Sequence, residues 1–189
     1  FQDGGYDDAG AGLYTINRTA TGAFSQLVTR TSLQLHTDDY LEVSDHADLD
    51  FEEDDDFTIW MLFRNHTATT EYHFDKRAVN GIGYGILNSG SNDYPIAFIG
   101  DGSTIDTTEV TPTYDFGESV LISASRSGNQ FRYGYNESLS ALETSTNGDL
   151  SNSAPLRIGS RYNGINTAVY ETVAFGLTKG TALSSDDLT

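Results

Sequence analysis

Carboxylates alternate along one short stretch of the sequence, where Asp48, Asp50 and Glu52 are separated by apolar residues. If this stretch is a β-strand, the three acidic side chains lie on one face, because successive side chains of a strand point to opposite faces. Hydrolysis of a glycosidic bond with retention uses two nearby carboxyl groups, one as nucleophile and one as acid/base. The stretch is therefore the candidate for catalysis. The acidic run continues through residues 53–56, which is more typical of a solvated turn.

The other residue types that could act as nucleophiles or metal ligands lack the spacing that catalysis or metal binding requires. The sequence contains no Cys, which excludes disulfides, thiolate metal sites and cysteine nucleophiles. No serine lies in a G-x-S-x-G elbow, the strand-to-helix turn of many hydrolases. The histidines have no H-x-x-x-H or H-E-x-x-H spacing, so each is read as a surface or strand-edge residue: His36, His46, His66 and His73.

The charge of the chain limits its partners. The 28 acidic and 10 basic side chains give a formal net charge of −18. Such a surface repels phosphate backbones and anionic lipid headgroups, and the basic residues are scattered between Arg18 and Lys179. No apolar window approaches the roughly 18 residues of a membrane span. We expect no nucleic-acid partner and no membrane insertion. The acidic surface favours solubility in salty water.

The elements that would position these residues follow a period of two. Phe57, Ile59, Met61 and Phe63 alternate with residues that include Trp60, so this strand is apolar on both faces near its start. It is predicted to be central in its sheet, with Phe57 and Trp60 as structural residues. Short strands separated by Gly, Asn, Asp and Ser predict an all-β, antiparallel β-sandwich. The predicted strands are residues 32–35, 40–43, 57–64, 72–74, 84–87, 96–99, 120–125, 130–136, 156–158 and 169–175.

The chain divides into an arm and one domain. Residues 1–12 are mostly Gly, Asp and Ala and are interpreted as a linker or N-terminal arm. Residues 13–189 have the length and the aromatic content of a single all-β domain. The sequence starts without Met, and we expect it to be a segment of a longer chain.

The order of several segments resembles the concanavalin A-like jelly rolls, in particular laminin G-like domains of bacterial surface proteins and bacteriophage tail or virion proteins. The residues that carry the resemblance are Thr37–Val43, Ala47–Phe51, Phe57–Trp60, Lys76–Arg77, Gly83–Leu87, Leu156–Ser160, Val169–Phe175 and Ala182–Ser184. The resemblance covers residues 13–189 and implies a jelly-roll fold. The lead-in of residues 13–19 is similar to laminin G-like modules in phage tail proteins. Tyr84 belongs to the matching G-Y-G segment and is expected to be structural.

The resemblance bears on the two candidate chemistries. Retaining glucanases of this superfamily carry an E-x-D-x-E strand, whereas this chain has Asp48 at the first position and the laminin G-like pattern places the same residues in a turn. Members of the family often hold calcium at the rim of the sandwich. Calcium takes six to eight oxygens, so several must converge from two loops. The candidate ligands are Asp101, in a tight glycine turn, with Asp38 and Asp39.

Glu171 shares the predicted strand of residues 169–175, where alternation with Phe175 predicts an inward side chain. The resembling family often places an acidic scaffold residue there, so Glu171 is read as structural.

The functions implied by the resemblance differ widely on one fold. We expect a non-catalytic binding or adhesion module, outside the cell or on a virion surface, with a carbohydrate or surface receptor as partner. The alternative is a structural virion component that packs against neighbouring subunits and binds no ligand. Glycoside hydrolysis is the third reading. A homo-oligomer formed through flanking segments stays open.

Overall fold

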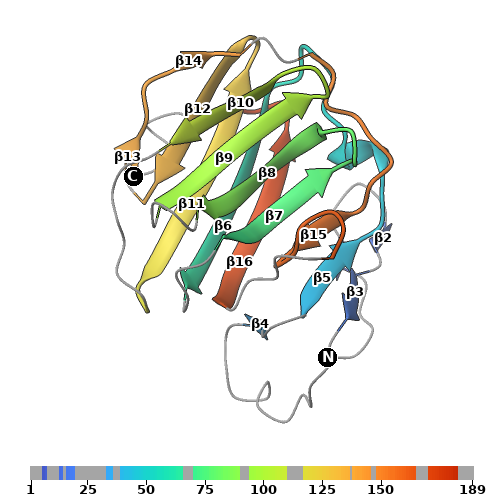
Figure 1. Cartoon of the computed structure of the whole chain (residues 1–189), viewed down its shortest axis with the longest axis vertical. Helices are drawn as coiled ribbons and strands as arrows, with labels where there is room; N and C mark the ends of the chain where they lie inside the picture. The colour runs from blue at the N-terminus through green and yellow to red at the C-terminus, as the bar shows by residue number, and fades with distance from the viewer. Residues whose placement is uncertain are drawn as a thin grey trace.

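The structure is a computed structural model in which two β-sheets lie face to face (Figure 1). It describes residues 6–7, 13–14, 16–19, 33–35, 39–65, 70–89, 94–109, 117–136, 138–145, 148–164 and 170–182. Every strand pairing within these residues is antiparallel. The antiparallel, jelly-roll-like β-sandwich predicted from the sequence is therefore the fold of the chain.

The sheet nearer the viewer in Figure 1, here called the front sheet, has the strand order β10-β9-β8-β7-β15-β5-β3. Its strands are β3 (Ile16–Thr19), β5 (Tyr40–Val43), β7 (Glu71–Arg77), β8 (Ile82–Ser89), β9 (Tyr94–Asp101), β10 (Ile105–Glu109) and β15 (Leu156–Ile158). Strands distant in sequence are neighbours here, since β15 lies between β7 and β5.

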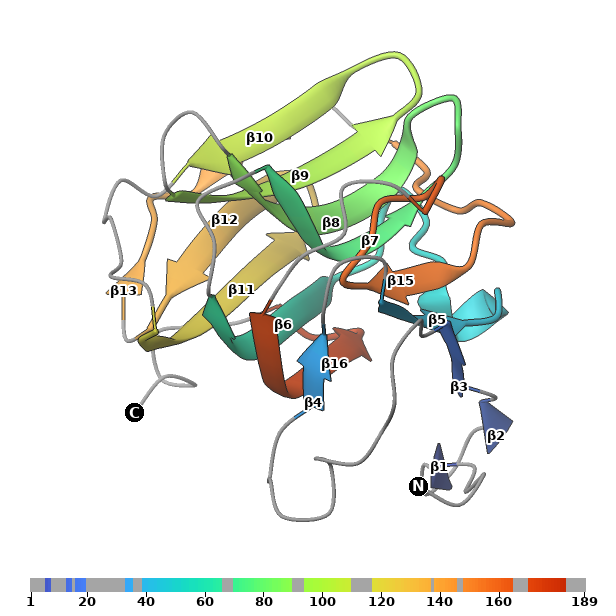
Figure 2. The same cartoon turned by 60° about the horizontal axis from the view of Figure 1, so that its bottom comes forward.

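The other sheet, here called the back sheet, has the strand order β13-β12-β11-β6-β16-β4, and β14 pairs with β12 beside this path. Its strands are β4 (Leu33–Leu35), β6 (Phe57–Asn65), β11 (Ser119–Ser127), β12 (Gln130–Tyr135), β13 (Ser138–Leu139), β14 (Glu143–Thr144) and β16 (Tyr170–Lys179). Figure 2 shows the two layers from another side.

Two smaller elements complete the described structure. The strands β1 (Tyr6–Asp7) and β2 (Leu13–Tyr14) form a two-stranded sheet. The 3₁₀ helix η2 (Ala47–Leu49) lies between β5 and β6. No helix among the described residues is both long enough and apolar enough to cross a membrane.

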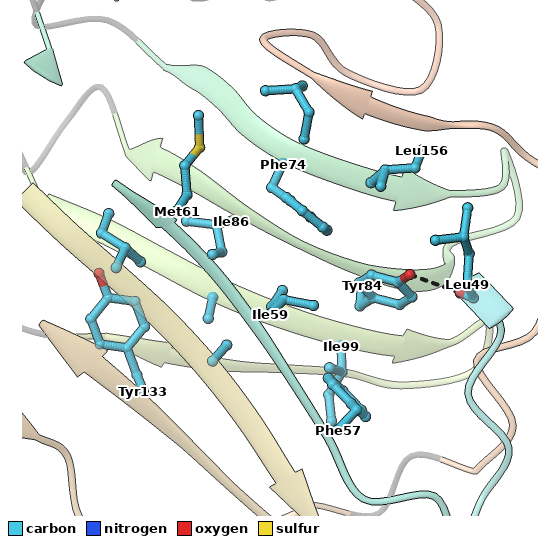
Figure 3. Close-up of a cluster of buried hydrophobic side chains, with 14 of the residues drawn as sticks. Leu49, Phe57, Ile59, Met61, Phe74, Tyr84, Ile86, Ile99, Tyr133 and Leu156 are labelled. Atoms are coloured by element: carbon cyan, nitrogen blue, oxygen red, sulfur yellow. Dashed lines mark hydrogen bonds between the residues drawn. The ribbon is translucent and has the colours of Figure 1, made fainter. Parts of the chain in front are cut away.

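The core fills the space between the two sheets, as Figure 3 shows. The inward side chains of β6 alternate as the sequence pattern predicts, and Phe57, Ile59, Met61 and Phe63 are fully buried. From the front sheet, Tyr84 is also fully buried, and its hydroxyl donates a hydrogen bond to the carbonyl of Leu49 at 2.7 Å. A buried phenol needs such an acceptor, so this bond fixes the turn before β6 to the front sheet.

Trp60 lies on the opposite face of β6 from the core. This strand pairs with β11 on one side and β16 on the other, which makes it a central strand of the back sheet. The side chain of Trp60 is partly exposed, and its indole covers Gly176 of β16, where a Cβ atom would lie 2.6 Å from the ring. Trp60 therefore packs along the outer face of the sheet rather than inside the sandwich.

Candidate functional site

One row of residues crosses five strands of the front sheet. The strand register aligns Phe98 of β9, Gly85 of β8, Asp75 of β7, Arg157 of β15 and Glu42 of β5. Their sequence neighbours supply core side chains, so this row lies on the outer face of the sheet. The outer face thus carries two carboxylates and one guanidinium group in register.

Glycines on β8 make room for this row. A Cβ atom at Gly85 would lie 2.6 Å from the ring of Phe98 and 2.4 Å from the carbonyl of Phe74. The ring of Phe98 therefore lies across β8, in space that any other residue at position 85 would occupy. Gly83 has a φ angle of 136°, and a Cβ there would lie 1.9 Å from the carbonyl oxygen of Lys76.

Two arginines share aromatic rings beside the row. The guanidinium carbon of Arg77 lies 4.6 Å from the ring centroid of Phe98, 5.2 Å from that of Tyr72 and 5.4 Å from that of Tyr162. The guanidinium carbon of Arg161 lies 5.6 Å from the centroid of Tyr72 and 4.8 Å from that of Tyr162. These distances are within the range of cation–π attraction.

The loop of residues 159–164 follows β15 and is fixed to the outer face of the front sheet (Figure 1). The backbone N–H of Tyr162 donates to Asp75 Oδ2 at 2.7 Å. Nη1 of Arg157 donates to the carbonyl of Arg161 at 3.1 Å and to that of Tyr162, while its Nε donates to Glu42 at 2.9 Å. Arg157 therefore holds both the loop and Glu42 through its Nε and Nη1 groups.

Arg77 and Arg161 keep unused donors. Arg77 Nε and Nη2, Arg161 Nε and Asp75 Oδ1 are all buried without a hydrogen-bond partner. The distance from Arg77 Nε to Asp75 Oδ1 is 3.6 Å, which is an ion-pair distance and too long for a hydrogen bond. Burial raises the pKa of Asp75 to about 7, against the opposing effects of Arg77, the Tyr162 N–H, Arg161 and Arg157.

We call these residues the arginine–aromatic cluster: Tyr72, Asp75, Arg77, Phe98, Arg157, Arg161 and Tyr162. Its groups are those used in recognition, a guanidinium group and an aromatic ring, and the partly exposed Arg161 and Tyr162 present them above the buried Tyr72 and Phe98. Buried N–H groups without an acceptor cost free energy, so an incoming acceptor would recover it. Tyr162 and Arg161 are partly exposed, and Arg77 exposes 8% of its surface.

The carboxylates considered for hydrolysis do not share a strand face. Asp48 is within the 3₁₀ helix η2, and Asp50 and Glu52 belong to the turn that follows. Asp50 Oδ1 accepts from Lys76 Nζ at 3.0 Å and from the backbone N–H of Asn152 at 3.2 Å. Glu52 is exposed. The strand geometry assumed for catalysis is therefore wrong, because the segment turns before β6 begins.

Lys76 ties this turn to the front sheet. The side chain is fully buried, and Nζ donates to Asp45 at 2.9 Å, to Asp50 at 3.0 Å and to the carbonyl of Asn152 at 2.7 Å. Each of its three N–H groups therefore has an acceptor. The lysine of the Lys76–Arg77 pair is a structural cation, while its neighbour lies on the opposite face.

The acidic run is organised by a second buried cation. Arg126 is fully buried against Phe57, with its guanidinium carbon 5.1 Å from the ring centroid. It donates to the carbonyls of Asp55 and Gly148 at 3.2 Å each and to that of Glu52. The ring of Phe57 stacks on that of Phe51 at a centroid distance of 4.0 Å. The carboxylates of the run thus surround a turn that Arg126 holds from inside.

The proposed calcium ligands are not brought together. Asp101 ends β9 at the edge where β8 starts, whereas Asp39 precedes the first residue of β5 at the other end of the sheet. Four strand steps separate β9 from β5, or about 19 Å. Asp101 Oδ1 accepts from the backbone N–H groups of Thr104 and Ser103, which hold the pKa of its carboxyl well below the usual range. Asp38 lies outside the described residues.

No cluster of three or more His, Asp or Glu suited to a metal ion occurs in the described ranges. Asp39 and Asp101 do not converge, because β8, β7 and β15 lie between their strands, and the sequence does not report this strand order.

Glu171 is on β16, and its side chain lies outside the described part of the chain. The register of β16 against β6 shifts between Thr172 and Ala174, and Glu171 is opposite Arg64. A bulge interrupts the alternation of faces, so the face of Phe175 does not determine the face of Glu171.

Sequence reasoning missed most of the arginine–aromatic cluster. Arg77 was noted only as part of a motif, and the predicted strand of residues 72–74 stopped before Asp75. The available signal was the pair of charged residues at 75 and 77, alternating with Phe74 and Lys76 in a segment that extends β7. The partners on β15 and in its loop depend on the strand order, which the sequence does not report.

Comparisons with known proteins show which solved structures share this fold. A scan against protein-family models finds no match, and no curated protein matches the sequence. Among solved structures, the chain is similar to one of botulinum neurotoxin type C, a toxin whose cell entry depends upon interaction with two ganglioside molecules (TM-score 0.68, 8% identity). It is also similar to the binding domain of botulinum neurotoxin DC in complex with rat synaptotagmin II (TM-score 0.66, 9% identity).

Both alignments cover 93% of this chain and 45% of the neurotoxin chain, so this chain spans about half the length of those structures. A heptameric SAP-like pentraxin from Limulus polyphemus aligns over 70% of this chain and 67% of its own, with a TM-score of 0.57 and 13% identity. The similarity at these identities is one of fold. The chain is a jelly-roll β-sandwich of the kind found in neurotoxin binding domains and pentraxins.

Proposed function

We propose that the chain is a non-catalytic module that binds a carbohydrate or a surface receptor through the outer face of its front sheet. The observation that carries this proposal is the arginine–aromatic cluster, where Arg77 and Arg161 have buried N–H groups without acceptors beside Tyr72 and Tyr162. Such a face can donate hydrogen bonds and offer ring surfaces to one ligand.

The structural neighbours support the same class of function. Their descriptions name gangliosides and synaptotagmin II as the molecules that the neurotoxin proteins contact. The proposed setting is outside the cell or on a virion surface, where a laminin G-like module would face glycans and receptors. Within this proposal the module acts by attachment and has no catalytic carboxylate pair.

A binding experiment tests the proposal. The chain is applied to an immobilised glycan panel and to intact cells, alongside Tyr162→Ala and Arg132→Ala variants. Arg132 is the matched control, because it belongs to β12 and lies on the outer face of the back sheet. We expect binding by the wild type and by Arg132→Ala, and loss of binding in Tyr162→Ala. A wild-type chain that binds neither glycans nor cells would favour the structural virion component instead.

A further inference from the structure

The charges of the arginine–aromatic cluster are unbalanced where Arg77 and Arg161 meet. Three arginines lie here, and Arg157 is paired with Glu42 at 2.9 Å. Asp75 is then the only carboxylate of the described cluster that faces both Arg77 and Arg161. Two cations thus share one anion.

Asp75 itself is committed to another partner. Its Oδ2 accepts the backbone N–H of Tyr162 at 2.7 Å, and its Oδ1 is 3.6 Å from Arg77 Nε. Asp75 Oδ1 therefore accepts no hydrogen bond from either arginine. The orphaned donors are Arg77 Nε and Nη2 and Arg161 Nε.

The geometry of the donor groups determines which kind of acceptor group fits them. A guanidinium group presents parallel N–H donors that match the two oxygens of a carboxylate, and such charge-assisted pairs are stronger than neutral hydrogen bonds. The two guanidinium groups lie over the same rings, Tyr72 and Tyr162, within 5.6 Å of both centroids. Arg77 Nε and Nη2 and Arg161 Nε are buried in this structure, so a small anionic group reaches donors of both side chains when the partly exposed Arg161 and Tyr162 side chains move aside.

The charge of the whole molecule limits how many negative charges the ligand can carry. With a net charge of −18, the chain repels dense polyanions such as sulfated chains or nucleic acids. A sugar with a single carboxylate meets little of this repulsion, because its charge lies inside the cluster. Its neutral ring can then rest against the partly exposed Tyr162.

On the basis of the proposed function, we propose that the ligand of this face is an acidic sugar, whose carboxylate pairs with Arg77 and Arg161. Sialic acids and uronic acids both supply this group. The wild-type chain should therefore bind sialyllactose or a hyaluronan disaccharide, each with a single carboxylate, and discriminate strongly against the same sugar without its negative charge.

The first experiment uses the unaltered protein and changes only the ligand. Isothermal titration measures binding of sialyllactose, its methyl ester and lactose, and of a hyaluronan disaccharide and its methyl ester. We expect one of the two acidic sugars to bind. Which of them binds shows whether the carboxylate comes from a sialic acid or from a uronic acid. The methyl ester or the neutral sugar should bind at least about tenfold more weakly, as expected for the loss of a charge-assisted pair.

The second experiment locates the carboxylate. Arg161→Gln should weaken binding of the acidic sugar by about tenfold or more and by a larger factor than it weakens binding of the neutral counterpart, while Arg132→Gln changes neither. Arg161 is the preferred position because its side chain is partly exposed, so the variant is expected to fold. The melting temperature of each variant checks that it has folded.

The outcomes separate this inference from the proposed function. Equal affinity for acidic and neutral sugars overturns the inference but leaves a glycan-binding module. Carboxylate-specific binding that Arg161→Gln does not weaken also overturns it, as does tighter binding of a heparin hexasaccharide than of either acidic sugar. If the chain binds no glycan and no cell surface, the proposed function itself fails.

Discussion

Asp75 lies between the loop that covers the front sheet and the guanidinium group of Arg77. The carboxyl is fully buried, and burial raises its pKa to about 7 although three arginines surround it. The folded state therefore binds a proton at Asp75 between pH 4 and 7, where an unfolded aspartate is ionised. This proton stabilises the fold as the pH falls from 7 towards 4.

We predict that Asp75→Asn removes this dependence. The free energy of unfolding of the wild type, relative to the variant, should increase by at most about 1.4 kcal/mol per pH unit as the pH falls from 7 to 4. Burial lowers the pKa of His73 to about 3, and His73 is present in both proteins, so its effect cancels in the difference. Urea unfolding of the wild type and the variant at pH 5 and pH 8 measures this difference in the free energy of unfolding. A difference that does not change with pH would mean that Asp75 is ionised throughout.

A second prediction concerns Lys76, the buried cation between Asp45 and Asp50. The Lys76→Met change leaves two carboxylates and the carbonyl of Asn152 facing one another without a positive charge. We expect a loss of about 3 kcal/mol in unfolding free energy, at the lower end for a broken buried pair because both carboxylates are partly exposed. Chemical denaturation measures the loss.

The matched control is Lys179→Met. Lys179 pairs with Asp55 at 2.9 Å, and its side chain is 39% exposed. Removal of this surface pair should cost less than about 1 kcal/mol. Equal effects of the two substitutions would contradict the structural role of Lys76.

Among the elements, β8 requires residues without a side chain at two positions on its outer face. Its outward positions 83 and 85 are glycines, and the ring of Phe98 from β9 occupies the space above Gly85. The inward position between them is Tyr84, which anchors the turn before β6. The same strand therefore supports the core on one face and the cluster on the other.

We predict that Gly85→Ala destabilises the fold by about 1–3 kcal/mol, because the new methyl group would overlap the Phe98 ring and the Phe74 carbonyl. Gly148→Ala is the control, since no atom lies within 4 Å of the corresponding Cβ position. Thermal unfolding of both variants measures the difference. A near-neutral Gly85→Ala would show that Phe98 does not lie across β8.

The strands themselves were largely predictable. The bounds of β5 and β15 agree with the sequence pattern, because apolar and polar residues alternate there without interruption. Strand β10 was missed, since Ile105 is the only apolar residue in it and it forms the edge of the front sheet. The bulges at residues 72–74 and 172–174 could not be foreseen, because they appear only in the pairing with neighbouring strands.

The candidate site depended on the same missing information. Asp75 and Arg157 are far apart in sequence and become neighbours because β15 inserts between β7 and β5. Alternation within a strand predicts which residues share a face. The order of the strands decides which residues of different strands become neighbours on that face.

For the molecule as a whole, the net charge of −18 predicts that salt stabilises the fold. Repulsion among surface carboxylates opposes folding, and counterions screen it. We expect the melting temperature to rise between 10 mM and 500 mM NaCl. Calcium should give no further rise over sodium at equal ionic strength, since Asp39 and Asp101 lie at opposite ends of the front sheet. A calcium-specific rise would indicate ligands beyond these two residues.

The row from Phe98 to Glu42 has a consequence for how such a protein can change over time. Its residues occupy the outward positions of strands whose inward positions build the core, so the two sets of side chains seldom touch. The loop beside this row is held through the backbone atoms of Arg161 and Tyr162, and their side chains are partly exposed, so these two side chains can be exchanged with little effect on the core. A library randomised at positions 161 and 162, with the core, Phe98 and Arg157 held constant, would put this independence to use in the selection of binders.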